Sequence, residues 1–243
     1  MSEIKYVIGN WKMNANAGDI VAFSQGLRKF KFPKKSNVQV GFASPAIYIM
    51  GLSKLQESVW VGGQDVSKFP RGDFTGEISA EMLADCGLDF CLVGQKERRL
   101  NFNETDEIIN QKLKNLQEFD VLPILFVGDS EKEREKNVSI KCVLERLRTD
   151  LANLDSTKQI IVVYEPMFDE GKVTNKSVSQ MVEAIKKELN VIYPKSEHIV
   201  LYSGKITVAN SNQLLSLSEL DGVVLNDCLD ADKFAKIVSC LYS

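Results

Sequence analysis

Four polar side chains that can take part in catalysis follow short apolar runs of this 243-residue chain. Asn10 and Lys12 come after the first such run, Gln95 after the fourth and Glu165 after the sixth. Together they offer an ammonium, two amides and a carboxylate. An amide N–H can donate a hydrogen bond to a carbonyl oxygen and so stabilise developing negative charge. An amide has no accessible pKa, however, and cannot pass a proton on.

The apolar runs are short, rich in β-branched residues and separated by longer amphipathic stretches, which is typical of alternating strands and helices. Several runs, such as Ile160–Tyr164, are continuously apolar, as a parallel strand covered by helices on both faces requires. The predicted strands are Tyr6–Ile8, Val38–Ala43, Val59–Val61, Phe90–Val93, Leu122–Val127, Ile160–Tyr164, Ile199–Tyr202 and Val223–Leu225.

Helical spacing of apolar residues is clearest over Asp106–Phe119, which Thr105 or Asp106 can cap. Further helices are predicted over Ser177–Leu189 and Leu229–Val238. Eight strand–helix repeats in a chain of this length predict an α/β fold of the (β/α)₈ barrel type, with a single domain over residues 1–243. An open doubly wound sheet is the alternative, but no Gly-x-Gly-x-x-Gly follows the first strand. A barrel gathers the residues after its strands at one mouth.

Composition argues against several functional classes. The formal net charge is −3 and the pI about 5.4, so we expect neither nucleic acid nor an anionic membrane as a partner. No apolar run approaches the roughly 20 residues that span a bilayer, and the first ten residues lack the layout of a signal peptide. The single histidine, His198, and five scattered cysteines predict no metal site and no cofactor. We therefore expect a cytoplasmic protein with reduced thiols.

Three segments, Gly9–Asn14, Gly94–Arg99 and Tyr164–Pro166, resemble triosephosphate isomerase, and the resemblance extends from about Lys5 to about Ile237. It implies that Glu165 removes a proton from the carbon next to a carbonyl. It implies also that Lys12, with Asn10 beside it, supplies positive potential to the substrate and the enediolate. Glu97 and Arg98 match an ion-pair network, and Pro166 matches a loop hinge. In the family a neutral histidine polarises the carbonyl, and here Gln95 stands in its place.

The resemblance also implies a phosphate site that this sequence alters. In the family, backbone N–H groups hold the phosphate, and they come from a closing loop, a Gly-Gly-Ser turn and a Gly-Gly pair that opens a short helix. The corresponding residues here are Gly171 and Lys172 in the loop, Ser203, Gly204 and Lys205 in the turn, and Asn226 and Asp227 in the pair. An Asn or Asp at a helix start caps the N–H groups that would otherwise bind an anion. We expect Asp227 to occupy the anion site itself.

A long connection, Gln64–Ile78, follows the third predicted strand. Within it, Thr75, Gly76 and Glu77 match the family's loop that inserts into a neighbouring subunit, so the resemblance implies a homodimer.

Two hypotheses for the function follow. The first is a diverged triosephosphate isomerase-like protein with weak or lost interconversion of glyceraldehyde 3-phosphate and dihydroxyacetone phosphate. The second is an active aldose–ketose isomerase, acting on triose phosphate or a related small sugar, with Glu165 as base. The sequence does not name the small-molecule ligand.

Overall fold

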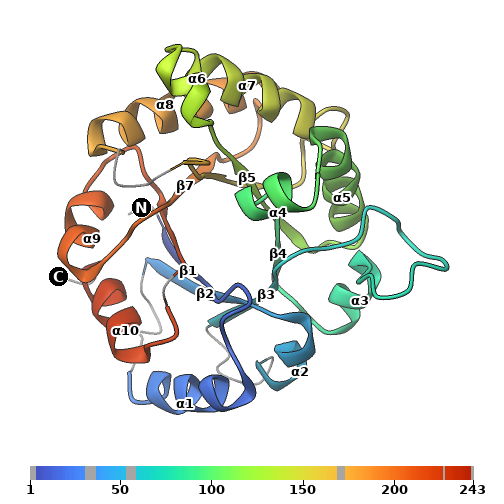
Figure 1. Ribbon diagram of the computed structural model, residues 1–243, viewed down its shortest axis with the longest axis vertical. Coiled ribbons are helices and arrows are strands. Elements are labelled where there is room, and N and C mark those ends of the chain that lie inside the picture. The colour runs from blue at the N-terminus through green and yellow to red at the C-terminus, as the bar shows by residue number, and fades with distance from the viewer. Residues whose placement is uncertain (1–3, 31–36, 53–58, 169–172, 227, 242–243) are drawn as a thin grey trace.

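Eight parallel strands close into a barrel, and helices surround it (Figure 1). The computed structural model describes residues 4–30, 37–52, 59–168, 173–226 and 228–241. The strands are β1 Lys5–Asn10, β2 Val38–Ser44, β3 Val59–Gly63, β4 Phe90–Val93, β5 Leu122–Val127, β6 Ile161–Tyr164, β7 Ile199–Ser203 and β8 Gly222–Leu225. Because β1 pairs with both β2 and β8, the sheet has no free edge. The predicted (β/α)₈ barrel is confirmed, and the open sheet is excluded.

All eight predicted strands are present, with bounds that agree exactly for β4 and β5 and differ by one or two residues at an end elsewhere. The extensions lie mainly at the carboxyl ends. Asn10 is the last residue of β1 and Ser203 the last of β7, so both are held by the sheet.

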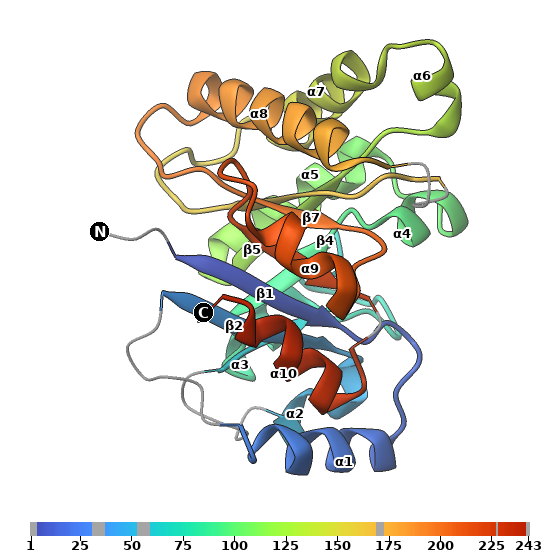
Figure 2. The ribbon, with the colours of Figure 1, turned by 90° about the vertical axis from the view of Figure 1, so that its left-hand side faces the viewer.

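The described helices follow the strands in sequence and lie outside them in space (Figure 2). They are α1 Ala17–Leu27, the 3₁₀ turn η1 Ala46–Tyr48, α2 Ile49–Leu52, α3 Ala80–Asp85, α4 Lys96–Asn101, α5 Asp106–Glu118, α6 Glu131–Glu135, α7 Ser139–Asp150, α8 Asn175–Ile192, α9 Val208–Leu215 and α10 Ala231–Ser239. Thr105, one of the two caps that the sequence predicted, caps α5. Helix α10 begins two residues later than predicted, because the Asp230 side chain accepts from the N–H groups of Asp232 and Lys233 and starts the helix there.

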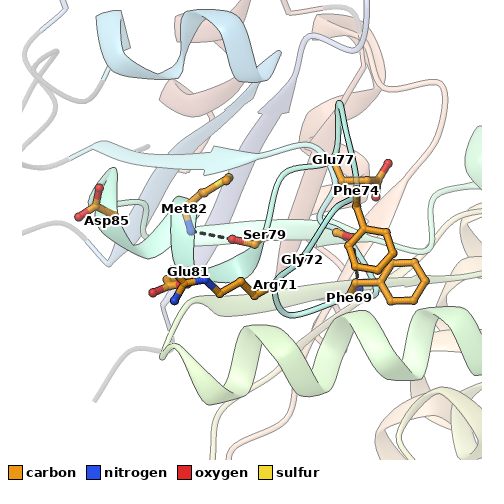
Figure 3. Close-up of a pocket in the computed structure, with 10 residues that line it drawn as sticks. Phe69, Arg71, Gly72, Phe74, Glu77, Ser79, Glu81, Met82 and Asp85 are labelled. Carbon is orange, nitrogen blue, oxygen red and sulfur yellow. Dashed lines mark hydrogen bonds between the residues drawn. The ribbon is translucent and has the colours of Figure 1, made fainter.

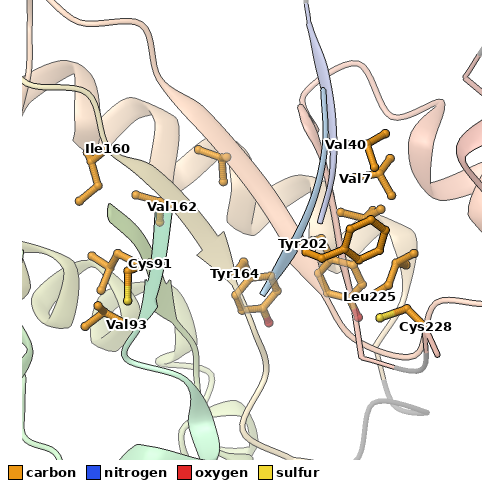
Figure 4. Close-up of a cluster of buried hydrophobic side chains, with 14 of the residues drawn as sticks. Val7, Val40, Cys91, Val93, Ile160, Val162, Tyr164, Tyr202, Leu225 and Cys228 are labelled. Carbon is orange, nitrogen blue, oxygen red and sulfur yellow. The ribbon is translucent and has the colours of Figure 1, made fainter. Parts of the chain in front are cut away.

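Alternate residues of each strand point to opposite faces, which divides the core into two layers. One set fills the barrel interior and includes Ile8, Val163, Leu201 and Val224. The other set packs between the strands and the helices, as Figure 4 shows for residues such as Val7, Val162 and Tyr202. The next inward-facing residue toward the carboxyl end of a strand lies at the barrel mouth.

Among the helices of the described chain, none combines the length and the apolar character that crossing a membrane requires.

Candidate active site

Four polar side chains continue the inward-facing set at the carboxyl ends of their strands. Asn10 lies two residues after Ile8, Glu165 two after Val163, Ser203 two after Leu201, and Asn226 two after Val224. The period of two therefore turns all four toward the barrel axis, directly above the apolar interior. Asn10, Glu165 and Ser203 are buried.

Glu165 is held at both carboxylate oxygens. The backbone N–H of Lys96 donates to its Oε2 at 3.0 Å, and the Ser203 hydroxyl donates to its Oε1 at 3.1 Å. Burial raises the pKa of Glu165, the negative charge of Glu97 raises it further, and the Lys12 ammonium opposes both effects. The buried carboxylate is thus a stronger base than an ordinary glutamate.

Close packing of the backbone fixes the position of Glu165. A Cβ atom built on Gly128, just after β5, would lie 1.8 Å from the Glu165 carbonyl oxygen, so only glycine permits this approach. Pro166 follows in a buried position, and the Met167 N–H donates to the Asp129 carbonyl at 2.9 Å.

The Gln95 side chain is buried, and both of its polar atoms are engaged by the protein. Its Nε2 donates to the Gln64 carbonyl at 2.7 Å, and its Oε1 accepts from Asn10 Nδ2 at 2.8 Å. The amide is therefore fixed in one orientation. Its second N–H proton is not used by either contact.

Gln64 connects the groups of the mouth, and the sequence analysis did not identify it as a site residue. Its Nε2 donates to the Lys12 carbonyl at 3.0 Å and to Asn10 Oδ1 at 3.2 Å. Gln64 could have been predicted as a site residue from its position, because it directly follows Gly63, the last residue of β3, and the carboxyl ends of barrel strands meet at the mouth. Lys96 was missed as well, because its contact with Glu165 is made by a backbone N–H.

Lys12 adopts a left-handed backbone conformation with φ of 49°, which is uncommon for a residue with a Cβ. Its ammonium pairs with Glu97 Oε1. Such strain is found mostly where the surrounding structure imposes it, and here the Lys12 N–H is bonded to Asn10 Oδ1 at 3.1 Å.

Arg98 belongs to a partly buried ion cluster beside the mouth. It contacts Glu104 at 2.6 Å and Asp65 at 2.8 Å, and Lys112 contacts the other oxygen of Asp65 at 2.6 Å. The cluster secures the Gln64–Asp65 segment to α4 and α5, and it is the Gln64 carbonyl in this segment that accepts from Gln95.

The residues expected at the phosphate site are only partly brought together. Ser203 and Gly204 are buried at the end of β7, whereas Lys205 is exposed. A Cβ atom on Gly204 would lie 2.2 Å from the Tyr202 hydroxyl, so a larger residue here would have to displace the Tyr202 side chain. Gly171, Lys172 and Asp227 lie outside the described residues, and the expected role of Asp227 stays a prediction.

In the part of the chain that the structure describes, Asn226 caps no helix. Its Nδ2 donates to Ser203 Oγ at 3.3 Å, and its buried Oδ1 has no hydrogen-bond partner in the described structure. The cap of α10 comes from Asp230 instead.

Thr75, Gly76 and Glu77 are exposed in the connection between β3 and α3, which projects from the rim of the barrel (Figure 1). In the same connection Phe69 and Phe74 stack with ring centroids 3.8 Å apart (Figure 3). A cavity of about 660 Å³ extends from Asn10, Lys12 and Gln95 at the mouth to Gly76 and Glu77. Its lining also contains two exposed apolar residues, Met13 and Phe102.

In the described part of the chain, no three His, Cys, Asp or Glu side chains are grouped so that they could hold a metal ion.

Comparison with known proteins gives one family. The family model described as triosephosphate isomerase matches residues 5–241. A triosephosphate isomerase from Neisseria meningitidis is 36% identical, with 98% of each chain covered. That from Malacoplasma penetrans is 32% identical over 96% of this chain and 97% of its own. In fold, the chain is similar to the crystal structure of triosephosphate isomerase from Bartonella henselae, with a TM-score of 0.86 and 24% identity over 98% of this chain and 99% of the other.

Proposed function

We propose, because this chain belongs to the triosephosphate isomerase family, that it interconverts glyceraldehyde 3-phosphate and dihydroxyacetone phosphate slowly, with Glu165 as the base. The observation that carries the proposal is the buried amide of Gln95, bonded on one side to Asn10 and on the other to Gln64, in the position of the family's histidine.

The retained groups support proton abstraction from carbon. Glu165 is buried with a raised pKa, which suits a carboxylate that takes a proton from the carbon next to a carbonyl. The Lys12 ammonium lies close enough to Glu165 to lower the pKa of that carboxyl, so it can also attract the developing enediolate. Glu165 then returns the proton to the neighbouring carbon.

The step that Gln95 impairs is the transfer of a proton between the two oxygens of the enediolate. The amide can donate its second N–H to an oxygen, but it cannot release and recapture that proton. Loss of acid–base assistance costs typically about 10²–10⁴-fold in rate. We therefore expect slow turnover with the reaction type preserved.

Binding of the phosphate is weakened as well. Two of the positions where the family has glycine, Ser203 and Asn226, carry side chains that hydrogen-bond to each other. Since binding energy on a remote phosphate helps to organise the reacting centre, its loss lowers turnover together with affinity. This feature also supports a second candidate function, isomerisation of a related small aldose–ketose pair without a phosphate.

Two further features follow from the family by analogy: we propose a homodimer, assembled through Thr75, Gly76 and Glu77, and a cytoplasmic location.

The test is an assay of the purified chain with each triose phosphate, with Glu165→Gln as the inactive control. We expect turnover more than about tenfold below the ~10³ s⁻¹ of fast ordinary enzymes, and weak inhibition by an enediolate-mimicking phosphonate. Turnover within tenfold of that value would contradict the proposal. Glyceraldehyde and dihydroxyacetone serve as a parallel pair of substrates, and faster conversion of this pair would favour the second candidate.

A further inference from the structure

Ser203 and Asn226 form a hydrogen-bonded chain that ends on the catalytic carboxylate. They lie at the carboxyl ends of the neighbouring strands β7 and β8. Asn226 Nδ2 lies 3.3 Å from Ser203 Oγ, and Ser203 Oγ lies 3.1 Å from Glu165 Oε1. Ser203 ends β7, while Glu165 and Asn226 directly follow β6 and β8 and continue the inward-facing alternation, so the barrel brings the three residues together.

The donors and acceptors that each group offers determine the direction of donation along these hydrogen bonds. An ionised carboxylate only accepts, so the single hydroxyl proton of Ser203 must point to Glu165. The Ser203 oxygen can then only accept from Asn226, which must present its NH₂ group. The buried Asn226 Oδ1 is left without a partner in the described structure.

A second donor holds the carboxylate from the opposite side of the site. The Lys96 N–H at the start of α4 reaches Oε2 of Glu165 at 3.0 Å. With one donor on each oxygen, both the position and the rotation of the carboxylate are determined. The Lys96 donor is a backbone group that any residue supplies, whereas the Ser203 donor depends on the side chain.

We propose that Ser203 and Asn226 are positioning residues that hold the Glu165 carboxylate, and not ligands of a substrate phosphate. The inference rests on the proposed role of Glu165 as base. It reassigns two positions where the family has glycines that leave backbone N–H groups free for the phosphate. Here the added side chains point along the mouth to the base.

This arrangement favours the ionised form of Glu165. When Glu165 takes a proton, its Oε1 becomes a weaker acceptor for the Ser203 hydroxyl, so the hydrogen bond from Ser203 stabilises the ionised form more than the neutral form. Three other charged groups act on the same carboxylate, namely Lys12, Lys96 and Glu97. These three residues stay in place when Ser203 or Asn226 is substituted, so the effect of the Asn226–Ser203 hydrogen bonds on the pKa of Glu165 can be measured separately.

The test follows the titration of the Glu165 carboxyl directly, by ¹³C NMR of the full chain with labelled glutamate, and Glu165→Gln assigns the signal. Ser203→Ala removes the donor and should raise the pKa of Glu165, because hydrogen bonds to the charged form are lost. Asn226→Ala should move it in the same direction by less. Adding Asn226→Ala to Ser203→Ala should cause no further change, since the two residues act through one contact.

Matched variants separate positioning from general stability. Ser203→Thr keeps the hydroxyl and should titrate like the parent chain. Ser211→Ala removes another fully buried hydroxyl, which bonds the Val208 carbonyl at 3.2 Å, and should leave the titration of Glu165 unchanged. If Ser203→Ala fails to fold, Asn226→Ala alone carries the test.

An unchanged titration in Ser203→Ala, or in Asn226→Ala where only that variant folds, would overturn the inference. So would an equal change in Ser211→Ala. Because the titration needs no substrate, this result is independent of whether the chain turns over triose phosphate.

Discussion

At the scale of single residues, the surroundings of Gln95 matter as much as its own chemistry. A donor, Asn10 Nδ2, and an acceptor, the Gln64 carbonyl, meet the two ends of its amide. These partners complement an amide well. They would also engage both nitrogens of a neutral imidazole placed there, which leaves neither nitrogen free for the substrate.

We therefore expect Gln95→His alone to raise kcat for triose phosphate by less than about tenfold, below the usual contribution of acid–base catalysis. Combining it with Lys205→Ser and Asp227→Gly should give the larger gain, since these two changes restore residue types of the family's phosphate turns and leave the contacts of Ser203 and Asn226 with the base intact. Steady-state kinetics of the single and combined variants provide the measurement. Full recovery by the histidine alone would show that the phosphate site is the smaller defect.

The pH dependence of the reaction is governed by Glu165. Burial and then Glu97 raise the pKa of its carboxyl, so kcat/KM should fall on the acid side at a higher pH than an ordinary glutamate would give. Glu97→Gln removes a negative neighbour and also frees the Lys12 ammonium from its partner. Both effects lower the pKa of Glu165, and the acid limb should move to lower pH.

The profile of kcat/KM against pH for the parent and Glu97→Gln checks this, with Glu81→Gln on α3 as a control outside the mouth. A limb that stays in place in Glu97→Gln would mean that Glu165 is not the group that titrates.

At the scale of elements, the sequence was sufficient for the strands because each is a short, mainly apolar run, and several are apolar without a break, as strands covered by helices require. Among the described helices it located only α5, α8 and α10, and short helices such as α2 and α9 carry little periodicity over their four and eight residues. The four groups predicted to share the mouth do so, since barrel geometry gathers strand ends. The contacts of Ser203 and Asn226 could not be predicted, because they depend on which strand residues face inward and on rotamers of side chains from neighbouring strands.

Helix α6, only five residues long, is stabilised by polar contacts more than by packing. The Ser130 hydroxyl and the Glu133 carboxylate form a capping box, and Arg146 of α7 binds Glu133. The helix in turn presents Arg134, whose guanidinium lies 4.6 Å from the Phe168 ring, close to the segment that follows Glu165. Loosening α6 would thus release a contact next to the base.

Glu133 should make stability depend on pH. Burial acts to raise its pKa, but hydrogen bonds from Arg146 and the Ser130 N–H prevail and lower the pKa to about 2. A carboxyl with a lowered folded pKa contributes stability above its unfolded pKa and loses it as the pH falls toward the folded value.

Glu133→Gln should therefore lower the free energy of unfolding by about 1 kcal/mol at pH 7, a typical value for a cap. The difference from the parent should shrink as the pH falls from the ordinary glutamate range toward about 2. Urea unfolding across this range measures it, and Glu145→Gln, in an exposed pair 3.9 Å from Lys141, is the control. A difference that does not depend on pH would assign the loss to the helix cap alone.

At the scale of the whole molecule, the exposed apolar side chains on one side of the barrel mouth are unusual for a monomer. Met13 is 95% exposed and Phe102 62%. Met13 and Phe102 line the cavity that also reaches Asn10, Lys12 and Gln95. Grouped apolar exposure of this kind marks a surface that another molecule covers. A second copy of the chain, with its own Thr75–Glu77 loop, is the occupant that the proposed homodimer supplies.

The corresponding prediction concerns the mass in solution. Sedimentation equilibrium at micromolar concentration should give twice the 27.2 kDa of the chain. Phe102→Asp places a charge in the covered surface and should shift the equilibrium to the monomer, because a buried unpaired carboxylate is costly. Val191→Asp introduces the same charge at a residue of α8 that is 75% exposed and should leave the dimer intact. A mass of 27.2 kDa for the parent chain would exclude the dimer. Equal dissociation of both variants would mean that the dimer surface does not involve Phe102.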